Sequence, residues 1–180
     1  MQSNRNDIQL LKPNIERDAP FAFSWFDRPE GWQTLLSMGN AENEITVSTI
    51  EGEKDTIKSF IKLENDNQQI TRMIIADNKT IGAVWIELFE NHNVKSPSIH
   101  IIIGDPEYRG KGIGISVMKA AIDYVRQSLN KKTIYSRHLV NNQAITNLTK
   151  TLGFENDGEP YVDDNGLNWQ NIKLNLSDNI

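Results

Sequence analysis

A run of β-branched residues that leads through a glycine-rich segment into an amphipathic helix constrains this chain more than any other feature. Residues 99–103 read Ile-His-Ile-Ile-Ile, which predicts a central strand covered on both faces. Over residues 113–130, apolar side chains recur at helical spacing along one face, opposite Lys119, Asp123 and Arg126. The chain between them must therefore turn sharply from a strand into a helix.

The rest of the sequence alternates predicted strands and helices. In chain order we expect a short strand at 8–12, one or two helices within 15–39, a helix at 53–65, a hairpin from 70–76 and 80–90, a strand at 132–140, a helix at 142–152 and two strands around the turn 163–166. The 180 residues suit a single domain. This order predicts an α+β fold, with a mixed, mostly antiparallel sheet of about seven strands and helices on both faces.

Composition excludes several classes of protein. The chain has no cysteine, which rules out disulfides, thiolate zinc sites and a cysteine nucleophile. Its three histidines, His92, His100 and His138, are far apart in sequence and show no metal-ligand spacing, so no metal site is expected. A net charge of −5 without a dense basic block argues against nucleic acid as a partner. The same charge favours a cationic ligand, although mild acidity also serves solubility.

No apolar stretch approaches the ~20 residues that cross a bilayer, and the polar N-terminus lacks the apolar segment of a signal peptide. We therefore expect a cytoplasmic protein without a membrane partner.

The glycine-rich segment 104–114 has the properties of an anion site. The first N–H groups of a helix lack internal partners, and the helix dipole adds partial positive charge there. Glycines let an anion approach the backbone, and Arg109 and Lys111 add formal charge. A phosphate or pyrophosphate is the expected ligand.

The spacing of the glycines excludes two nucleotide-binding motifs. In a Gly-x-Gly-x-x-Gly fingerprint the third glycine would fall on Ile115 or Val117, and neither position is glycine. The chain also lacks the Gly-x-x-x-x-Gly-Lys-Ser/Thr sequence of a P-loop.

Residues 105–114, Asp-Pro-Glu-Tyr-Arg-Gly-Lys-Gly-Ile-Gly, contain Arg-x-x-Gly-x-Gly and closely resemble motif A of the GNAT superfamily of N-acetyltransferases. A second similarity is the asparagine-capped segment 141–154, which ends in Leu-Gly-Phe. The resemblance covers residues 70–176 well and residues 8–65 by element order only. The aromatic-rich segment 21–32 is most similar to the RimJ/RimL-type and aminoglycoside 6′-N-acetyltransferase branches.

This resemblance implies an enzyme that moves acetyl from acetyl-CoA to a primary amine by direct attack. The acceptor would be a protein N-terminus, an aminoglycoside, a polyamine or another small amine. Within one GNAT domain, 1–180, it assigns residues 8–65 to the acceptor side, 70–152 to the acetyl-CoA-binding core and 153–178 to a C-terminal hairpin. It leaves a homodimer open. The alternative is a non-catalytic CoA-binding or sensor module of the same fold.

The resemblance also implies which residues bind the donor. The end of the central strand would pair with the pantetheine arm through Ile102, Ile103 and Gly104. The backbone of the glycine turn would bind the pyrophosphate through Arg109, Gly110, Lys111, Gly112, Ile113 and Gly114. Near the later helix, Asn142 (or Asn141) and Thr149 would flank the thiol.

The chain departs from the family at the general acid. Where many members carry a tyrosine, this sequence has Thr149, or Leu148 when counted from Asn141. Nothing in the spacing shows whether another tyrosine replaces it; the candidates are Tyr108, Tyr135 and Tyr161.

A base must deprotonate the acceptor, because an alkyl ammonium titrates near ~10. The candidates, in order, are His100, His138 and Glu87, and for each the alternative is a purely structural side chain. The aromatic segment 21–32 is interpreted either as core or as a wall of the acceptor site.

Overall fold

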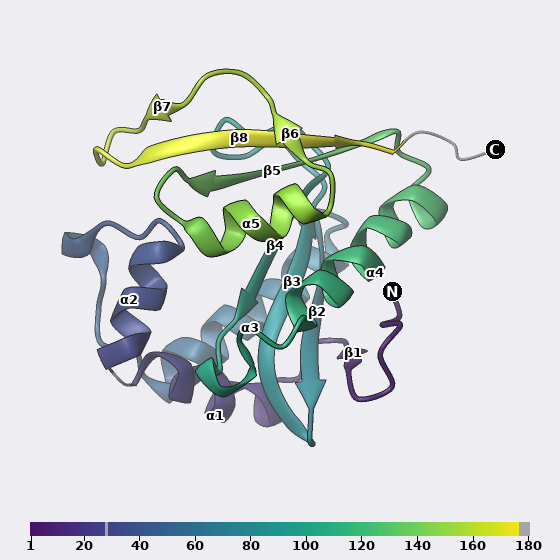
Figure 1. Ribbon diagram of the computed structural model, residues 1–180. Helices are drawn as coiled ribbons and strands as arrows, with labels where there is room; N and C mark the ends of the chain where they lie inside the picture. Colours follow the sequence, from purple (N-terminus) through teal and green to yellow (C-terminus); the bar gives the residue numbers. More distant parts are fainter. Residues whose placement is uncertain (28, 177–180) are drawn as a thin grey trace.

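The computed structural model describes residues 1–27 and 29–176 and shows a single α+β domain built on one open sheet (Figure 1). The last two residues of the predicted 153–178 segment lie outside the described residues. The strands are β1 (Gln9–Leu11), β2 (Gln69–Ala76), β3 (Lys79–Glu87), β4 (Ser98–Ile103), β5 (Thr133–Leu139), β6 (Glu155–Asn156), β7 (Tyr161–Val162) and β8 (Asn168–Asn175). The α-helices are α1 (Ile15–Phe26), α2 (Pro29–Ser37), α3 (Ile50–Asn65), α4 (Ile113–Ser128) and α5 (Gln143–Thr151).

The sheet has the order β1-β2-β3-β4-β5-β8-β6, with β7 paired to β8. All of its pairs are antiparallel except β4 and β5. The β2–β3 hairpin forms as predicted, because Asp77 and Asn78 adopt φ values of 48° and 59°. Two successive positive φ values are those of a type I′ turn, which suits the twist of paired strands.

The parallel pair is where the sheet divides. Ser98 and Tyr135 are the one registered pair between β4 and β5. Beyond it the two strands separate, and β5 continues beside β8 (Figure 1). The sheet therefore consists of one part, β1 to β4, and a second part, β5 to β8, that meet along a short seam.

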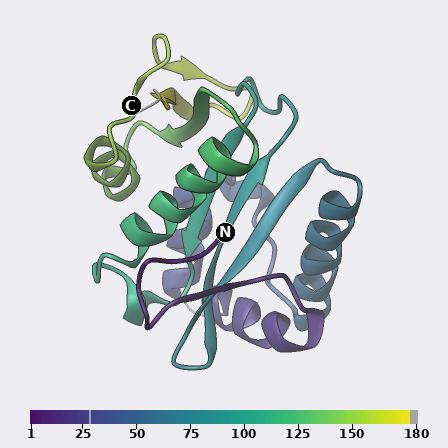
Figure 2. The same cartoon turned by 90° about the vertical axis from the view of Figure 1, so that its right-hand side faces the viewer.

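Helices cover both faces, as the sequence predicts. Figure 2 shows α4 on one face of the sheet and α1 with α3 on the other. The larger core lies under α4 and includes Val117, Ala121, Val125, Ile86, Ile99 and Ile134. Burial of each such aliphatic side chain contributes about 1.5–3 kcal/mol, so this contact anchors the strand–turn–helix unit.

The expected sheet of about seven strands is confirmed: the described residues form eight, and β8 pairs with β5 on one edge and with two short strands, β6 and β7, on the other. Two sequence expectations need correction. Helix α3 begins at Ile50 rather than residue 53, because the Thr49 hydroxyl caps the N–H of Gly52 at 3.0 Å. Strand β4 is central but not fully covered, since His100, Ile101 and Ile103 are only half-buried.

Within the described parts of the chain, no helix combines the length and apolar character needed to span a bilayer.

A buried carboxylate joins α1 to β3. The side chain of Asp18 is 0% exposed and accepts hydrogen bonds from the Thr80 hydroxyl at 2.7 Å and from the backbone N–H of Asn14 at 2.7 Å. The Arg17 guanidinium donates two more bonds, at 2.7 and 2.9 Å. Both carboxylate oxygens are thus satisfied, which is the condition for burying this charge at low cost.

We expect Asp18→Asn to lower the free energy of unfolding by about 2 kcal/mol, because the amide nitrogen cannot accept and leaves a buried donor unpaired. Urea denaturation monitored by circular dichroism measures this change. Asp55→Asn, at an exposed carboxylate paired with Lys58, is the control and should leave the midpoint unchanged. Equal midpoints for the two variants would contradict a role for Asp18 in holding α1.

Candidate active site

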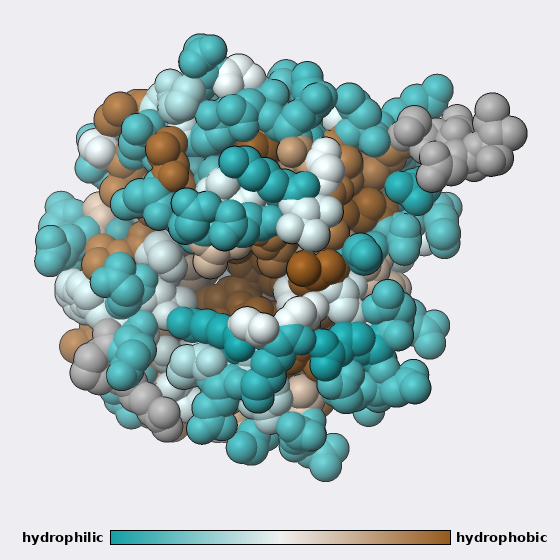
Figure 3. All heavy atoms as spheres, viewed as in Figure 1, coloured by the Kyte–Doolittle hydropathy of each residue, from teal (hydrophilic) through white to brown (hydrophobic). Residues whose placement is uncertain are grey.

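A cleft of about 900 Å³ opens where β4 and β5 separate. Its walls come from β4, the turn 108–114, β5, α5 and α2. Figure 3 shows it as a hollow with an apolar floor near the centre of this face. Of the predicted donor-binding residues, all line the cleft except Gly104 and Lys111. The divergence of two strands has therefore brought together residues that the sequence separates.

One edge of β4 is free within this cleft. Gly104 donates its N–H to the Ile81 carbonyl, and the antiparallel register then directs the polar groups of Ile102 toward β3 as well. The N–H and C=O groups of Ile101 and Ile103 face the opposite way, into the opening. Of the three predicted residues at the end of β4, only Ile103 thus turns its backbone polar groups toward the opening, whereas Ile102 and Gly104 turn theirs toward β3.

The glycine turn forms the end of the cleft nearest α4. Gly110 and Gly112 have φ values of 71° and 74°, in the left-handed region that glycine adopts without strain. Gly112 is the N-cap of α4 and accepts the N–H of Ser116, so the N–H groups of the residues between them have no partner inside the helix. These donors, together with the helix dipole, suit a pyrophosphate.

The Arg109 side chain holds the end of β4 and part of α2. Its Nε donates to the Ile103 carbonyl at 2.8 Å, and Nη2 donates to the Gly104 carbonyl at 2.9 Å and to the Thr34 hydroxyl at 3.0 Å. Burial lowers the pKa of Arg109, with the charge of Asp105 opposing this effect. The Arg109 guanidinium thus holds the end of β4 to α2, while the backbone of Arg109 belongs to the glycine turn.

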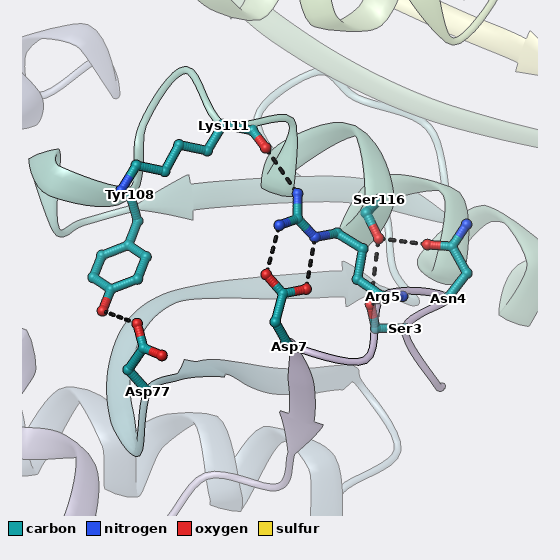
Figure 4. Close-up of polar contacts among 8 residues, drawn as sticks. All are labelled: Ser3, Asn4, Arg5, Asp7, Asp77, Tyr108, Lys111 and Ser116. Carbon is teal, nitrogen blue, oxygen red and sulfur yellow. Dashed lines mark hydrogen bonds and ion pairs between the residues drawn. The ribbon is translucent and has the colours of Figure 1, made fainter.

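The N-terminal segment braces the turn from outside, and nothing in the sequence indicated this contact. Arg5 donates from Nη1 to the Lys111 carbonyl at 2.8 Å, and its guanidinium is held by Asp7 at 2.9 and 2.6 Å (Figure 4). Ser116, in the first turn of α4, donates to the Asn4 side chain at 2.6 Å. The cationic Arg5 therefore lies against the glycine turn and adds positive potential there.

Helix α5 forms the opposite wall. The Asn142 side chain caps α5 through the Ile145 N–H at 3.2 Å and donates to the Ser37 carbonyl of α2 at 2.9 Å. Asn142 therefore links α5 to α2. Thr149 is buried, and its hydroxyl donates to carbonyls within the same helix, the nearer being that of Ile145 at 2.9 Å. Thr149 lines the cleft but has its proton engaged, so it is not a replacement for the missing tyrosine.

The three candidate tyrosines differ in position. Tyr108 lines the cleft, its hydroxyl donates to Asp77 at 2.8 Å, and this bond raises the pKa of Tyr108 to about 12 (Figure 4). The Tyr161 hydroxyl accepts a hydrogen bond from Arg137 at 3.3 Å, and neither Tyr135 nor Tyr161 lines the cleft.

His100 lies on the face of the sheet covered by α1 and α3. Its ring stacks on Trp85 at 5.3 Å, and Trp85 stacks on Phe60 of α3 at 6.2 Å. The Nε2 atom of His100 lies 3.1 Å from the Ser98 hydroxyl and 3.7 Å from the Glu87 carboxylate. Burial alone would raise the pKa of Glu87, but its hydrogen bond to His100 and the nearby positive charge lower it below the usual value. His100 lines the cleft, whereas Glu87 is not among the residues that line it.

His138, the second candidate base, is buried on β5 and also lines the cleft. Its Nδ1 lies 2.9 Å from the Leu139 carbonyl.

A second cavity of about 470 Å³ lies beneath α1 and α3 and shares Met38, Trp85 and Ile102 with the cleft. Trp25 and Phe26 line it, and Trp25 is also buried in the core beside Met73, whereas Trp32 is 41% exposed. Part of the aromatic segment 21–32 is thus both core and cavity wall. The sequence indicated the aromatic residues but not the cavity, because its other wall comes from residues 44–60.

Among residues 1–27 and 29–176, no three histidine, aspartate or glutamate side chains gather in a way that would hold a metal ion.

The chain belongs to the family of GNAT acetyltransferase domains, whose model matches residues 9–155. No curated protein sequence is significantly similar to that of the chain. The fold expected from the glycine motif is confirmed, and the chain is an acetyl-CoA-dependent N-acetyltransferase. The bare strand edge and the glycine turn fit acetyl-CoA as the cosubstrate.

Several solved acetyltransferases share the fold. The microcin C7 self-immunity acetyltransferase MccE, in complex with acetyl-CoA and AMP, is 17% identical with a TM-score of 0.78, covering 95% of this chain and 93% of its own. The ribosomal-protein-S5-alanine acetyltransferase of Vibrio fischeri is 20% identical (TM-score 0.77, coverage 99% and 98%). The spermidine N-acetyltransferase of Vibrio cholerae, in complex with CoA and spermine, is 19% identical (TM-score 0.72, coverage 96% and 97%).

We expect Gly110→Ala to weaken CoA binding about tenfold, because a left-handed conformation costs an alanine about 1 kcal/mol and the added methyl group would enter the cleft. Isothermal titration with CoA measures the Kd. Gly166→Ala is the matched control: Gly166 has a φ of 77° in the β7–β8 turn, and like Gly110 it has no atom within 4 Å of an added Cβ. Both variants should lose similar stability, and an equal Kd for the two would refute the role of the turn.

Proposed function

We propose that the protein transfers acetyl from acetyl-CoA to a cationic primary amine, and that the amine reaches the thioester from the second cavity. One observation carries this proposal. The opening between β4 and β5 has the glycine turn and free strand edge for the donor, and its boundary with the second cavity, at Trp85 and Ile102, lies beside His100. The two substrates would therefore meet at β4 from opposite faces of the sheet.

The donor would lie along the free edge of β4. The backbone groups of Ile101 and Ile103 would hydrogen-bond the amides of the pantetheine arm, and an N–H directed into the opening would polarise the thioester carbonyl. The pyrophosphate would accept from the N–H groups of the turn 109–114, with Arg5 nearby as a cation. Asn142 and Thr149 would form the apposed wall rather than donate protons.

His100 is the base in this proposal, and Glu87 orients it. In the tautomer with the proton on Nε2, that proton would face the Ser98 hydroxyl at 3.1 Å with the Glu87 carboxylate at 3.7 Å, and Nδ1 would carry the free lone pair. No described residue hydrogen-bonds Nδ1. Nδ1 would take the proton from the ammonium, directly or through a water molecule. His138 is the second candidate, because it also lines the cleft but lies on β5, away from the second cavity.

The reaction then needs no tyrosine. The neutral amine attacks the carbonyl carbon, the new C–N bond forms as the C–S bond breaks, and the thiolate of CoA leaves. The nitrogen becomes positively charged as it attacks and releases one proton, which leaves a neutral amide and is available to the departing thiolate. Thiols titrate near ~8.5, so the thiolate is a stable leaving group that takes a proton afterwards. The engaged hydroxyl groups of Thr149 and Tyr108 are consistent with this route.

The acceptor class is supported by charge. The second cavity is lined by two carboxylates, Glu44 and Glu53, and by four aromatic rings. Aromatic faces and carboxylates both attract ammonium groups. Two of the similar proteins named above are acetyltransferases of an S5 alanine and of spermidine, both of which offer amines.

Release of free CoA thiol from acetyl-CoA, measured with a panel of amines, tests the function. A peptide N-terminus, an aminoglycoside and aliphatic amines cover the classes considered. Turnover with one class would identify the acceptor. Binding of CoA without turnover on any amine would instead support the non-catalytic sensor module.

For an acceptor identified in this way, we expect His100→Ala to lower kcat/KM about 100-fold, the usual contribution of a general base. The loss should shrink at high pH, where the amine needs no base. His92→Asn is the control, because His92 is an exposed histidine in a loop outside both cavities. Retention of full kcat/KM by His100→Ala across the pH range would exclude His100 as the base.

A further inference from the structure

The second cavity has a charged end away from the donor cleft. Glu53 lies in the first turn of α3 and lines the cavity, and the Ser48 hydroxyl donates to its Oε1 at 2.8 Å. Glu53 forms no ion pair with any described residue, in contrast to Glu51 on the same turn, which pairs with Lys54 at 3.0 Å. The cavity thus contains a carboxylate that is stabilised by the Ser48 hydroxyl and the N-terminus of α3 but paired with no cationic side chain of the described residues.

The surroundings of Glu53 favour a bound cation. Burial raises its pKa, and the Ser48 hydrogen bond opposes the change only in part. No lysine or arginine is among the described residues that line the cavity. A carboxylate that has lost part of its water gains more from a cation than an exposed one does.

The region between the two ends is apolar. Glu53, Ile57 and Phe60 lie at positions i, i+4 and i+7 of α3, on one face of the helix, and all three line the cavity. Ala83 and Ile102 line it from the sheet. Seven residues of helix rise about 10 Å along the axis, which is the separation of the Glu53 and Phe60 backbone positions. The ring of Phe60 in turn stacks on Trp85.

We propose that this cavity selects an aliphatic diamine, with one ammonium held by Glu53 and the other amine presented at Trp85 and His100. The inference rests on the proposed function, since it names the acceptor of that same reaction. A methylene chain suits the apolar middle of the cavity, and a cationic group suits its carboxylate end. A monoamine of equal length would keep the apolar contact of its methylene chain but would lack the ammonium group that contacts Glu53.

The test compares diaminohexane with hexylamine, as acceptors in the thiol-release assay, for wild type, Glu53→Gln and Glu51→Gln. Wild type and Glu51→Gln should prefer the diamine by about tenfold or more in kcat/KM, as expected for a charge-assisted contact. Glu53→Gln should reduce this ratio to near one with little effect on hexylamine. Glu53→Asp keeps the charge and should retain part of the preference for the diamine. Its activity would also show that the fold tolerates a change at this position.

The outcomes separate this inference from the proposed function. If both amines react but wild type shows no preference, or Glu53→Gln keeps it, the diamine inference is overturned and the acetyltransfer stands. The same holds if a short peptide amine is preferred and Glu53→Gln has no effect on it. If no amine releases thiol, the proposed function fails, and titration calorimetry of diaminohexane against hexylamine still decides: tighter diamine binding that Glu53→Gln abolishes supports the site, and equal binding overturns it.

Discussion

The separation of β4 from β5 is the constraint on which the rest of this structure depends. After the pair Ser98–Tyr135, a strand in the middle of the sheet loses its neighbour on one side. Backbone N–H and C=O groups left bare inside a protein are costly unless something pairs with them. Two carbonyls are satisfied by side chains, that of Ile99 by Ser136 and that of Ile103 by Arg109. The polar groups of Ile101 and the N–H of Ile103 remain for a ligand that carries amides.

The local parts of the fold could be predicted from the sequence. The β-branched run, the glycine turn and the amphipathic period of α4 each act over a few residues, and all three occur where they are expected. The order of elements also gave the mixed sheet. The separation of β4 from β5 was not predictable. A run of apolar residues such as 99–103 indicates that a strand is buried, but not which of its two edges lacks a neighbouring strand.

Of the candidate site, only the backbone segment that forms the glycine turn could be predicted from the sequence. The glycine turn lies in one segment, but the contacts that shape the cleft join residues 75, 105 and 106 positions apart: Arg109 to Thr34, Asn142 to Ser37 and Arg5 to Lys111. No periodicity or spacing encodes such pairs. The sequence also did not reveal that the side chains of Asn142 and Thr149, which line the cleft as expected, hydrogen-bond to protein groups.

Helix α2 is held to the rest of the cleft by two of these contacts, both in its C-terminal half: Arg109 to Thr34, and Asn142 to Ser37 at the last residue of the helix. Met38, just beyond the helix, lines both cavities. A shift of α2 would consequently reshape both cavities together. If a ligand in one cavity moved α2, its binding would change the affinity of the other cavity, and the effect would be reciprocal.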